Sequence, residues 1–194
     1  MSALIFTAED LPLLGEPLAV EFANSLYQGE ETIDFLSSKP NIALWFQTAE
    51  KARELHVPSR LTVRDIEQLA LLRGVIRALL LAAVSKEPLP AREVRALNEF
   101  AAISPSFSML TPAGDGFIVS TVASERTLDG LLGRLAHEAI ILLGENSKLL
   151  RQCATPGCPM LFVQAHHRRR WCHESCGHRS RQAAYYQRKL KRSQ

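Results

Sequence analysis

The chain has 194 residues, of which 46% are hydrophobic and 22% are charged, so its composition is that of a globular protein and excludes a disordered one. No uninterrupted apolar run approaches the roughly 20 residues that span a bilayer, and the opening MSALIFTAEDLP lacks the basic start of a signal peptide, so we expect a cytoplasmic protein without a membrane partner. Residues 1–150 carry 13 Lys/Arg and 19 Asp/Glu whereas residues 151–194 carry 10 and 1, which predicts that the C-terminal segment binds something anionic.

The first third of the chain predicts three helices. In GEPLAVEFANSLY, Pro17 suits the first turn of a helix, and Leu18, Phe22 and Leu26 recur every four residues on one face. A second helix is expected over residues 39–56. The third, over residues 61–86, opens with a T-x-x-D capping signal and keeps a 3.6-residue apolar period throughout, so we expect it to form the spine of the core.

The middle of the chain predicts two more helices and one hairpin. Pro90 begins a shorter helix, and the segment 127–145 has a broad apolar face that ends near Gly144 and Asn146. Between them lie SFSML and GFIVSTV, separated by the turn sequence TPAGD. The predicted fold class is therefore mainly α with a small β-hairpin (α+β).

The helical body offers no catalytic motif. It contains no phosphate loop, no G-x-G-x-x-G and no G-x-S-x-G. Glu21 and Asn24 are polar neighbours on an otherwise apolar helix, and they are weak candidates for contact with a ligand; a solvent-facing or capping role explains them equally well. We therefore do not expect an enzyme.

All four cysteines lie in the last 44 residues, with the spacing C153-x4-C158-x13-C172-x3-C176. Two close pairs can wrap one tetrahedral Zn²⁺, and four thiolates leave no open position, so we expect one structural zinc per chain. Such a short segment rarely folds on its apolar residues alone, and zinc supplies the missing stability. An alternative use of the four cysteines is a pair of disulfides, but these would need an oxidising compartment. Mixed Cys/His ligation would draw on one of the nearby histidines: His166, His167, His173 and His178.

The basic residues surround this cysteine frame. CPMLFV and RRRWC are expected to form a short ribbon with Phe162 and Trp171 beside the metal, and a basic helix should follow Cys172, with Tyr185 packed on the knuckle. A basic helix braced by a zinc knuckle presents cations to phosphates or to a DNA groove. The predicted nucleic-acid contacts are Arg168, Arg169, Arg170, Arg179, Arg181, Arg188, Lys189 and Arg192.

The C-terminal segment resembles the CGNR zinc fingers, whose signature is found here as Cys176-Gly177-His178-Arg179, with His178 in place of asparagine. Gln164 and His166 also stand where that family often has Asp and Ser. The stretch LAVEFANSLY, followed by LNEF and LGRLAHEA, resembles the helical ABATE domain that precedes such fingers. The resemblance implies an ABATE-like domain over residues 1–150, a zinc finger over residues 151–194 with the four cysteines as ligands, and a bacterial, stress-induced transcriptional regulator.

The first functional hypothesis is accordingly a DNA-binding regulator whose helical body is a sensor or an oligomerisation unit. A small-molecule effector and a homodimer both remain open. The alternative is a zinc-knuckle adaptor that binds RNA or a protein partner, because basic charge alone does not select DNA. A third reading is an enzyme with a pocket in the N-terminal domain, and it has the weakest support because no nucleophile and base can be assembled.

Overall fold

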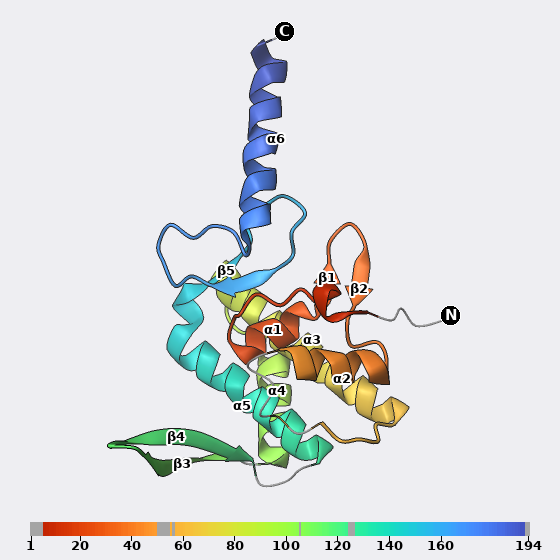
Figure 1. Cartoon of the computed structure of the whole chain (residues 1–194), viewed down its shortest axis with the longest axis vertical. Coiled ribbons are helices and arrows are strands. Elements are labelled where there is room, and N and C mark those ends of the chain that lie inside the picture. The colour runs from red at the N-terminus through yellow and green to blue at the C-terminus, as the bar shows by residue number, and fades with distance from the viewer. Residues whose placement is uncertain (1–5, 50–54, 56, 105, 124–126, 193–194) are drawn as a thin grey trace.

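The central element of the fold is α3 (Val63–Ser85), as the computed structural model shows for the described residues 6–49, 55, 57–104, 106–123 and 127–192. It contacts α1 (Leu18–Asn24), α4 (Ala91–Ile103) and α5 (Leu128–Asn146) (Figure 1). The predicted capping box is present: Thr62 N–H donates to Asp65 Oδ2 (2.6 Å) and Asp65 N–H donates to Thr62 Oγ1 (3.2 Å). The middle of its apolar stripe is fully buried, which confirms α3 as the spine of the core: Leu69, Leu72, Ile76, Leu79 and Leu80.

By length and composition alone, α3 could cross a membrane. Two of its residues, Arg73 and Arg77, are nevertheless buried and hydrogen-bonded to other elements, and α1, α4 and α5 pack around it. A helix that is apolar on most sides fits the core of a globular protein equally well. We therefore describe α3 as the buried core helix.

The helix α1 is shorter than its apolar spacing predicts. It ends at Asn24, where the Ser25 hydroxyl donates to the Phe22 carbonyl (2.6 Å), and the chain passes into β1 (Leu26–Gln28). Leu26 is thus in a strand and not on the helix stripe, because β1 pairs antiparallel with β2 (Thr32–Asp34). This correction matters because the short strand places Tyr27 against the finger.

The remaining predicted helices are confirmed. α2 (Lys39–Thr48) buries Ile42, Trp45 and Phe46, while the expected continuation over 50–54 and 56 lies outside the described residues. α4 begins after Pro90. α5 runs through Gly144 to Asn146, so only the second of the two expected stop signals marks its end.

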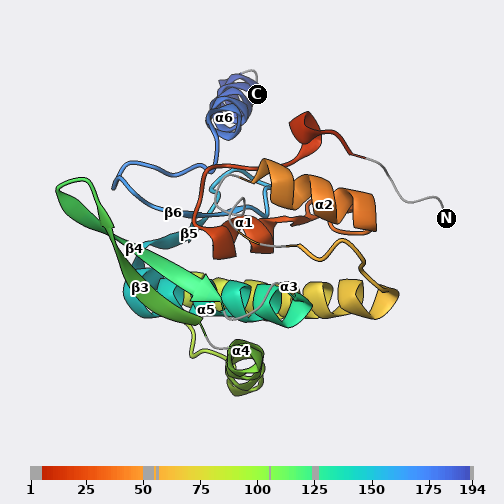
Figure 2. The ribbon, with the colours of Figure 1, turned by 60° about the horizontal axis from the view of Figure 1, so that its bottom comes forward.

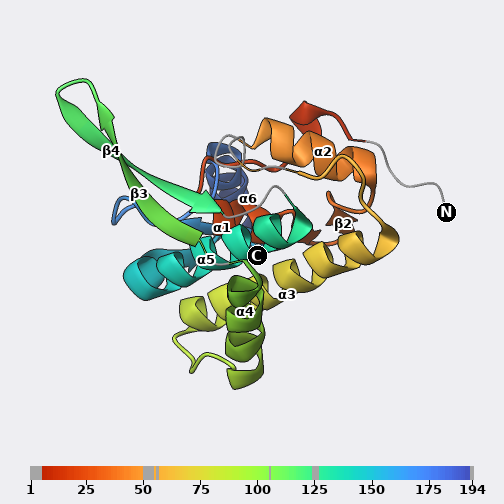
Figure 3. The ribbon, with the colours of Figure 1, turned by 90° about the horizontal axis from the view of Figure 1, so that it is seen from below.

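The predicted hairpin forms β3 (Ser106–Ala113) and β4 (Gly116–Ala123), which pair antiparallel with Leu110 opposite Val119. Both strands contact α5, and the turn of the hairpin extends away from the helices (Figures 2 and 3). Helices with small antiparallel strand pairs make up the fold, in agreement with the predicted α+β class.

The expected ribbon of CPMLFV with RRRWC is wrong. The strand β6 (Leu161–Val163) pairs with β5 (Leu150–Gln152), which follows the short 3-10 turn η3 (Ser147–Leu149). Leu150 and Leu161 are both fully buried in the core of the body, so burial selects this pairing. The last helix, α6 (Glu174–Arg192), projects from the finger away from the body (Figure 1).

Candidate metal centre and basic helix

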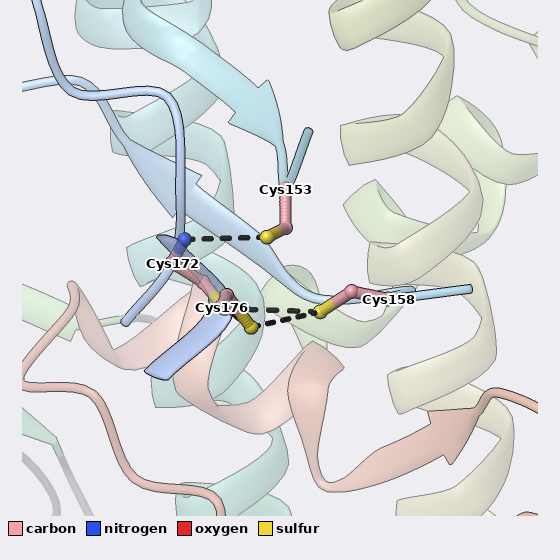
Figure 4. Close-up of side chains that lie close together, drawn as sticks. All are labelled: Cys153, Cys158, Cys172 and Cys176. Carbon is pink, nitrogen blue, oxygen red and sulfur yellow. Dashed lines mark hydrogen bonds between the residues drawn. The ribbon is translucent and has the colours of Figure 1, made fainter. Parts of the chain in front are cut away.

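The four cysteines converge on one point although they come from separate segments (Figure 4). Cys153 follows β5, Cys158 ends a tight turn, Cys172 precedes α6 and Cys176 lies in its first turn. All four sulfurs lie within 4.8 Å of one another, and all four residues are buried. The Sγ–Sγ distances are 3.8 Å for Cys158–Cys172, 3.6 Å for Cys172–Cys176 and 3.8 Å for Cys176–Cys158.

This geometry fits tetrahedral zinc. A Zn–S bond of ~2.3 Å gives a tetrahedron whose edges are about 3.8 Å, close to the three separations among Cys158, Cys172 and Cys176. The cysteines are free thiols, which agrees with a metal site and not with the disulfide alternative. The four nearby histidines are exposed and do not join the cluster, so the donor set within the described residues is all sulfur.

Local backbone geometry explains how the finger holds this cluster. Gly157 adopts a φ of +76°, a left-handed conformation suited to glycine, and the turn closes when Cys158 N–H donates to the Thr155 carbonyl (3.0 Å). The Thr155 hydroxyl then donates to the Cys176 carbonyl (2.9 Å) and thereby fixes the turn to α6. The predicted role of TPGC as the knuckle turn is confirmed.

The thiols influence one another strongly. A hydrogen bond from Cys172 lowers the pKa of Cys158 to about 5, although burial opposes this shift. The same hydrogen bond raises the pKa of Cys172, and burial adds to the rise. Within this pair a negative charge is therefore more stable on Cys158 than on Cys172, and a bound Zn²⁺ would favour the thiolate form of its ligands.

Arg179 belongs to the outer shell of the cluster. Its guanidinium donates to the Cys176 sulfur at 3.1 Å, and this hydrogen bond raises the pKa of Arg179. Gly177 precedes it at a close contact: a Cβ there would lie 3.2 Å from the Trp171 ring. In the signature Cys176-Gly177-His178-Arg179, the glycine thus admits Trp171 beside the site and the arginine supports a ligand.

Arg169, predicted as a phosphate contact, makes several contacts inside the protein. It forms a 2.6 Å ion pair with buried Glu16 of the body and donates to the carbonyls of Val163 (3.2 Å) and Cys172 (2.9 Å). Its guanidinium also lies 4.6 Å from the centroid of the Phe162 ring. With its donors directed inward, Arg169 joins the finger to the body.

The ligand candidates Glu21 and Asn24 lie on α1, close to the contact between the body and the finger. The Glu21 carboxylate accepts the backbone N–H groups of Leu14 and Glu16, both at 2.8 Å, and burial raises its pKa. The Asn24 side chain donates to the Leu161 carbonyl (2.9 Å) and accepts its N–H (3.0 Å), as a neighbouring strand would. The two bonds of Asn24 hold β6 against the end of α1.

Two further residues of the body complete this contact, and sequence reasoning did not single them out. Tyr27 packs against the cysteine cluster, and Arg77 donates to the Pro159 carbonyl (3.0 Å). Tyr27 is the last residue of the stretch LAVEFANSLY, and this stretch therefore packs the body against the finger. The polar residues Glu21 and Asn24 within its apolar helix were the sequence signal for this contact.

The positions that depart from the CGNR pattern are accommodated locally. Gln164 donates to the Arg169 carbonyl (2.8 Å), and His166 Nδ1 accepts the Arg168 N–H (3.2 Å). Both bonds shape the loop that carries the three arginines. His178 is exposed on α6.

The other predicted cations form the outer surface of the finger. Arg168 and Arg170 are exposed on the loop, and Arg181, Arg188 and Lys189 are exposed on α6. The guanidiniums of Arg170 and Arg181 lie 5.8 and 5.7 Å from the Trp171 ring centroid. Arg192 ends α6, and its side chain lies outside the described part.

The expected packing of Tyr185 on the knuckle is wrong. Tyr185 and Tyr186 are 58% and 63% exposed, because α6 leaves the finger after its first turns. The two rings lie edge to face with centroids 5.8 Å apart. They therefore add an aromatic element to the basic surface.

Two family models match the chain, and together they cover most of it. Residues 16–146 match ABATE, described as "Putative stress-induced transcription regulator", and residues 150–189 match the CGNR zinc finger. The comparison with curated proteins finds no matching sequence. The CGNR match and the four close cysteines agree on a single metal site suited to one structural Zn²⁺. Since the first match spans more than half of the chain, the protein belongs to the ABATE family and carries a C-terminal CGNR zinc finger.

Proposed function

We propose that this protein is a DNA-binding transcriptional regulator whose zinc finger, with Cys153, Cys158, Cys172 and Cys176 as ligands, positions α6 against the phosphate backbone. The observation that carries the proposal is the basic helix itself: α6 projects from the body and holds six Lys/Arg against one acid, Glu174. Exposed cations on a protruding helix gain affinity for a duplex by releasing its counterions.

The proposal divides the chain at residue 150 by function. Residues 1–150 form a regulatory body with an excess of acids, and residues 151–194 form the reader. The boundaries of the two family models support this division. We place the protein in the bacterial cytoplasm, where the chromosome lies, and we assign it no enzymatic activity, since both family descriptions are non-enzymatic.

A salt titration of duplex binding tests this role in the full-length, zinc-loaded protein. We expect Arg168→Gln/Arg188→Gln to weaken binding and to reduce the slope of log K against log salt by about 2, because each lost phosphate contact removes about 0.9. The matched control is Arg92→Gln/Arg95→Gln, which neutralises two exposed arginines on α4 and should leave the slope unchanged. Equal slopes for all three proteins would refute the proposed interface.

Tyr185 and Tyr186 favour a second candidate, the binding of single-stranded RNA. Exposed aromatic rings provide stacking surfaces for unpaired bases, each worth roughly 1–3 kcal/mol. If Tyr185→Ala weakens binding to a single strand while duplex binding is absent, the finger is an RNA adaptor.

A further inference from the structure

A cavity of about 590 Å³ lies where the body meets the finger, beside the C-terminal end of α3. Both α3 and α5 end next to this junction, and η3 connects α5 to β5 (Figure 1). Ser147 and Lys148 of the cavity wall lie between the two segments that the family models match, and Arg151 lies at the start of the second segment. The cavity has the size of a small-molecule site and the position, between two parts of a chain, in which such sites are common.

The rim of the cavity is positively charged. Lys86 follows α3, Lys148 lies in η3 and Arg151 lies in β5, whereas Glu87 is the only acid among the described residues that line it. Within the described part of the chain, none of these three cations forms an ion pair. The Arg151 guanidinium is fixed because its Nη1 donates to the carbonyls of Lys148 and Leu150, both at 2.7 Å. The rim therefore offers fixed positive charge to a ligand.

Lys86 adopts a backbone conformation that lysine rarely takes. Its φ of 58° is left-handed, and no other non-glycine residue in the described ranges has a positive φ. The Lys86 N–H donates to the Ala83 carbonyl (3.2 Å) and the Glu87 N–H donates to the Ala82 carbonyl (3.0 Å), a helix ending whose left-handed position is usually glycine. The rim of the cavity thus holds a lysine where glycine would be less strained, and such strain is concentrated at functional sites.

Apolar side chains form the rest of the wall: Ala83, Val84, Leu89 and Leu143. We propose that the cavity binds a small carboxylate with an apolar tail, with the carboxylate at the three cations and the tail against the apolar wall. Charge-assisted hydrogen bonds orient the carboxylate, and burial of the tail adds affinity. A free phosphate would leave the apolar wall uncovered, and a neutral molecule would leave the cations unpaired. Binding of this ligand goes beyond the proposed function and does not depend on contact with DNA.

Backbone amide chemical shifts of the isotope-labelled, zinc-loaded, full-length protein test the proposal. The probes are octanoate and cinnamate, and the matched neutral compounds are octanamide and cinnamamide. For at least one carboxylate we expect saturable shifts at the amides of residues 83–87 and 147–151, with a Kd below about 1 mM. The corresponding amide compound should bind at least about 10-fold more weakly, because it loses the ionic contacts with the rim.

The variant Lys86→Gly separates a role in binding from a role in the fold. Glycine suits the left-handed conformation, so this variant should unfold at a higher urea concentration than the wild type and yet bind the carboxylate about 5-fold more weakly. We expect Lys148→Gln to weaken binding by a similar factor, about 5-fold. The matched control is Arg64→Gln, which neutralises an exposed cation in the first turn of α3, at the other end of that helix, and should bind as the wild type does.

Four results would each overturn the proposal. The first two are the absence of saturable shifts with both carboxylates and shifts confined to α6. The third is equal affinity for a carboxylate and its amide. The fourth is an affinity for the carboxylate that Lys86→Gly and Lys148→Gln leave unchanged, or that Arg64→Gln lowers to the same extent.

Discussion

At the scale of single residues, Arg179 shows how one side chain in the first turns of α6 can influence zinc. Its guanidinium donates to the Cys176 sulfur at 3.1 Å, which stabilises the thiolate that a metal requires. We expect Arg179→Gln to weaken zinc affinity about 10–100-fold, as measured by competition with a chromogenic chelator. Arg188→Gln, further along the same helix, is the control and should retain wild-type affinity.

Asp34 provides a pH-dependent prediction in the body. Burial alone would raise the pKa of Asp34, but the two hydrogen bonds and the charge of buried Arg73 outweigh burial and lower it. A lowered pKa in the folded state means that the ion pair contributes fully above the unfolded pKa of about 4 and is lost as the pH falls below it.

We therefore expect Asp34→Asn to reduce the free energy of unfolding by about 1–2 kcal/mol at pH 7, after allowance for the partial exposure of Asp34. The difference from the wild type should shrink as the pH falls below 4. Urea denaturation of the wild type and Asp34→Asn, from pH 7 to below pH 4, measures this difference in the free energy of unfolding. A difference that stays constant with pH would contradict the assigned ion pair.

The roles of individual residues could be predicted only where the sequence spacing carries the chemistry. The four cysteines could be identified because two close pairs separated by a short loop match the ligand spacing of a tetrahedral zinc site. Arg169 could not be separated from Arg168 and Arg170, since its partners Glu16 and Phe162 are brought to it only by the tertiary fold.

At the scale of elements, the seam between α1 and β6 depends on Asn24. Its amide pairs with both backbone groups of Leu161, and all of these groups are buried. Removing the amide leaves a buried N–H and a buried carbonyl without partners, which costs about 1–3 kcal/mol for each group.

We therefore expect Asn24→Ala to lower the free energy of unfolding by about 2–4 kcal/mol in chemical denaturation. The control is Asn98→Ala, because Asn98 is exposed on α4. This substitution should change the free energy of unfolding little. A similar loss for both variants would argue against the seam.

The helices of the body followed from local signals, whereas strand pairing did not. Thr62 and Asp65 cap α3 within a few residues of sequence, so a periodic pattern was sufficient to predict that helix. The partner of β6 is β5, and that choice depends on burial of Leu150 and Leu161 in a core built from distant helices. Tyr185 was misplaced for a related reason: no local pattern reveals that α6 leaves the finger.

At the scale of the whole molecule, the finger and the body share one core. Leu150 and Leu161 belong to the core of the body, and Tyr27 and Leu14 of the body pack against the cysteine cluster. Loss of the metal should therefore disturb elements outside the finger. This coupling also explains why variants of the full chain, rather than truncations at residue 150, are suited to the DNA experiment.

Hydrogen exchange with and without a strong zinc chelator measures the coupling. After chelation we expect faster exchange at the amides of β5, β6 and α1, because α1 contacts β6 directly. The amides of α4, which packs on α3 and α5, should keep most of their protection and serve as the internal control. Faster exchange confined to residues 150–176 would show that the two parts are energetically independent.

Because Leu150 and Leu161 belong to the core of the body, we expect loss of zinc to destabilise the whole chain and not the finger alone. Proteases act on transiently opened chains, and a loss of 1–2 kcal/mol can change the abundance of a protein several-fold. Zinc starvation would then lead to degradation of the whole protein, and not only to unfolding of the zinc finger. Its cellular amount would report metal availability without a separate sensing site.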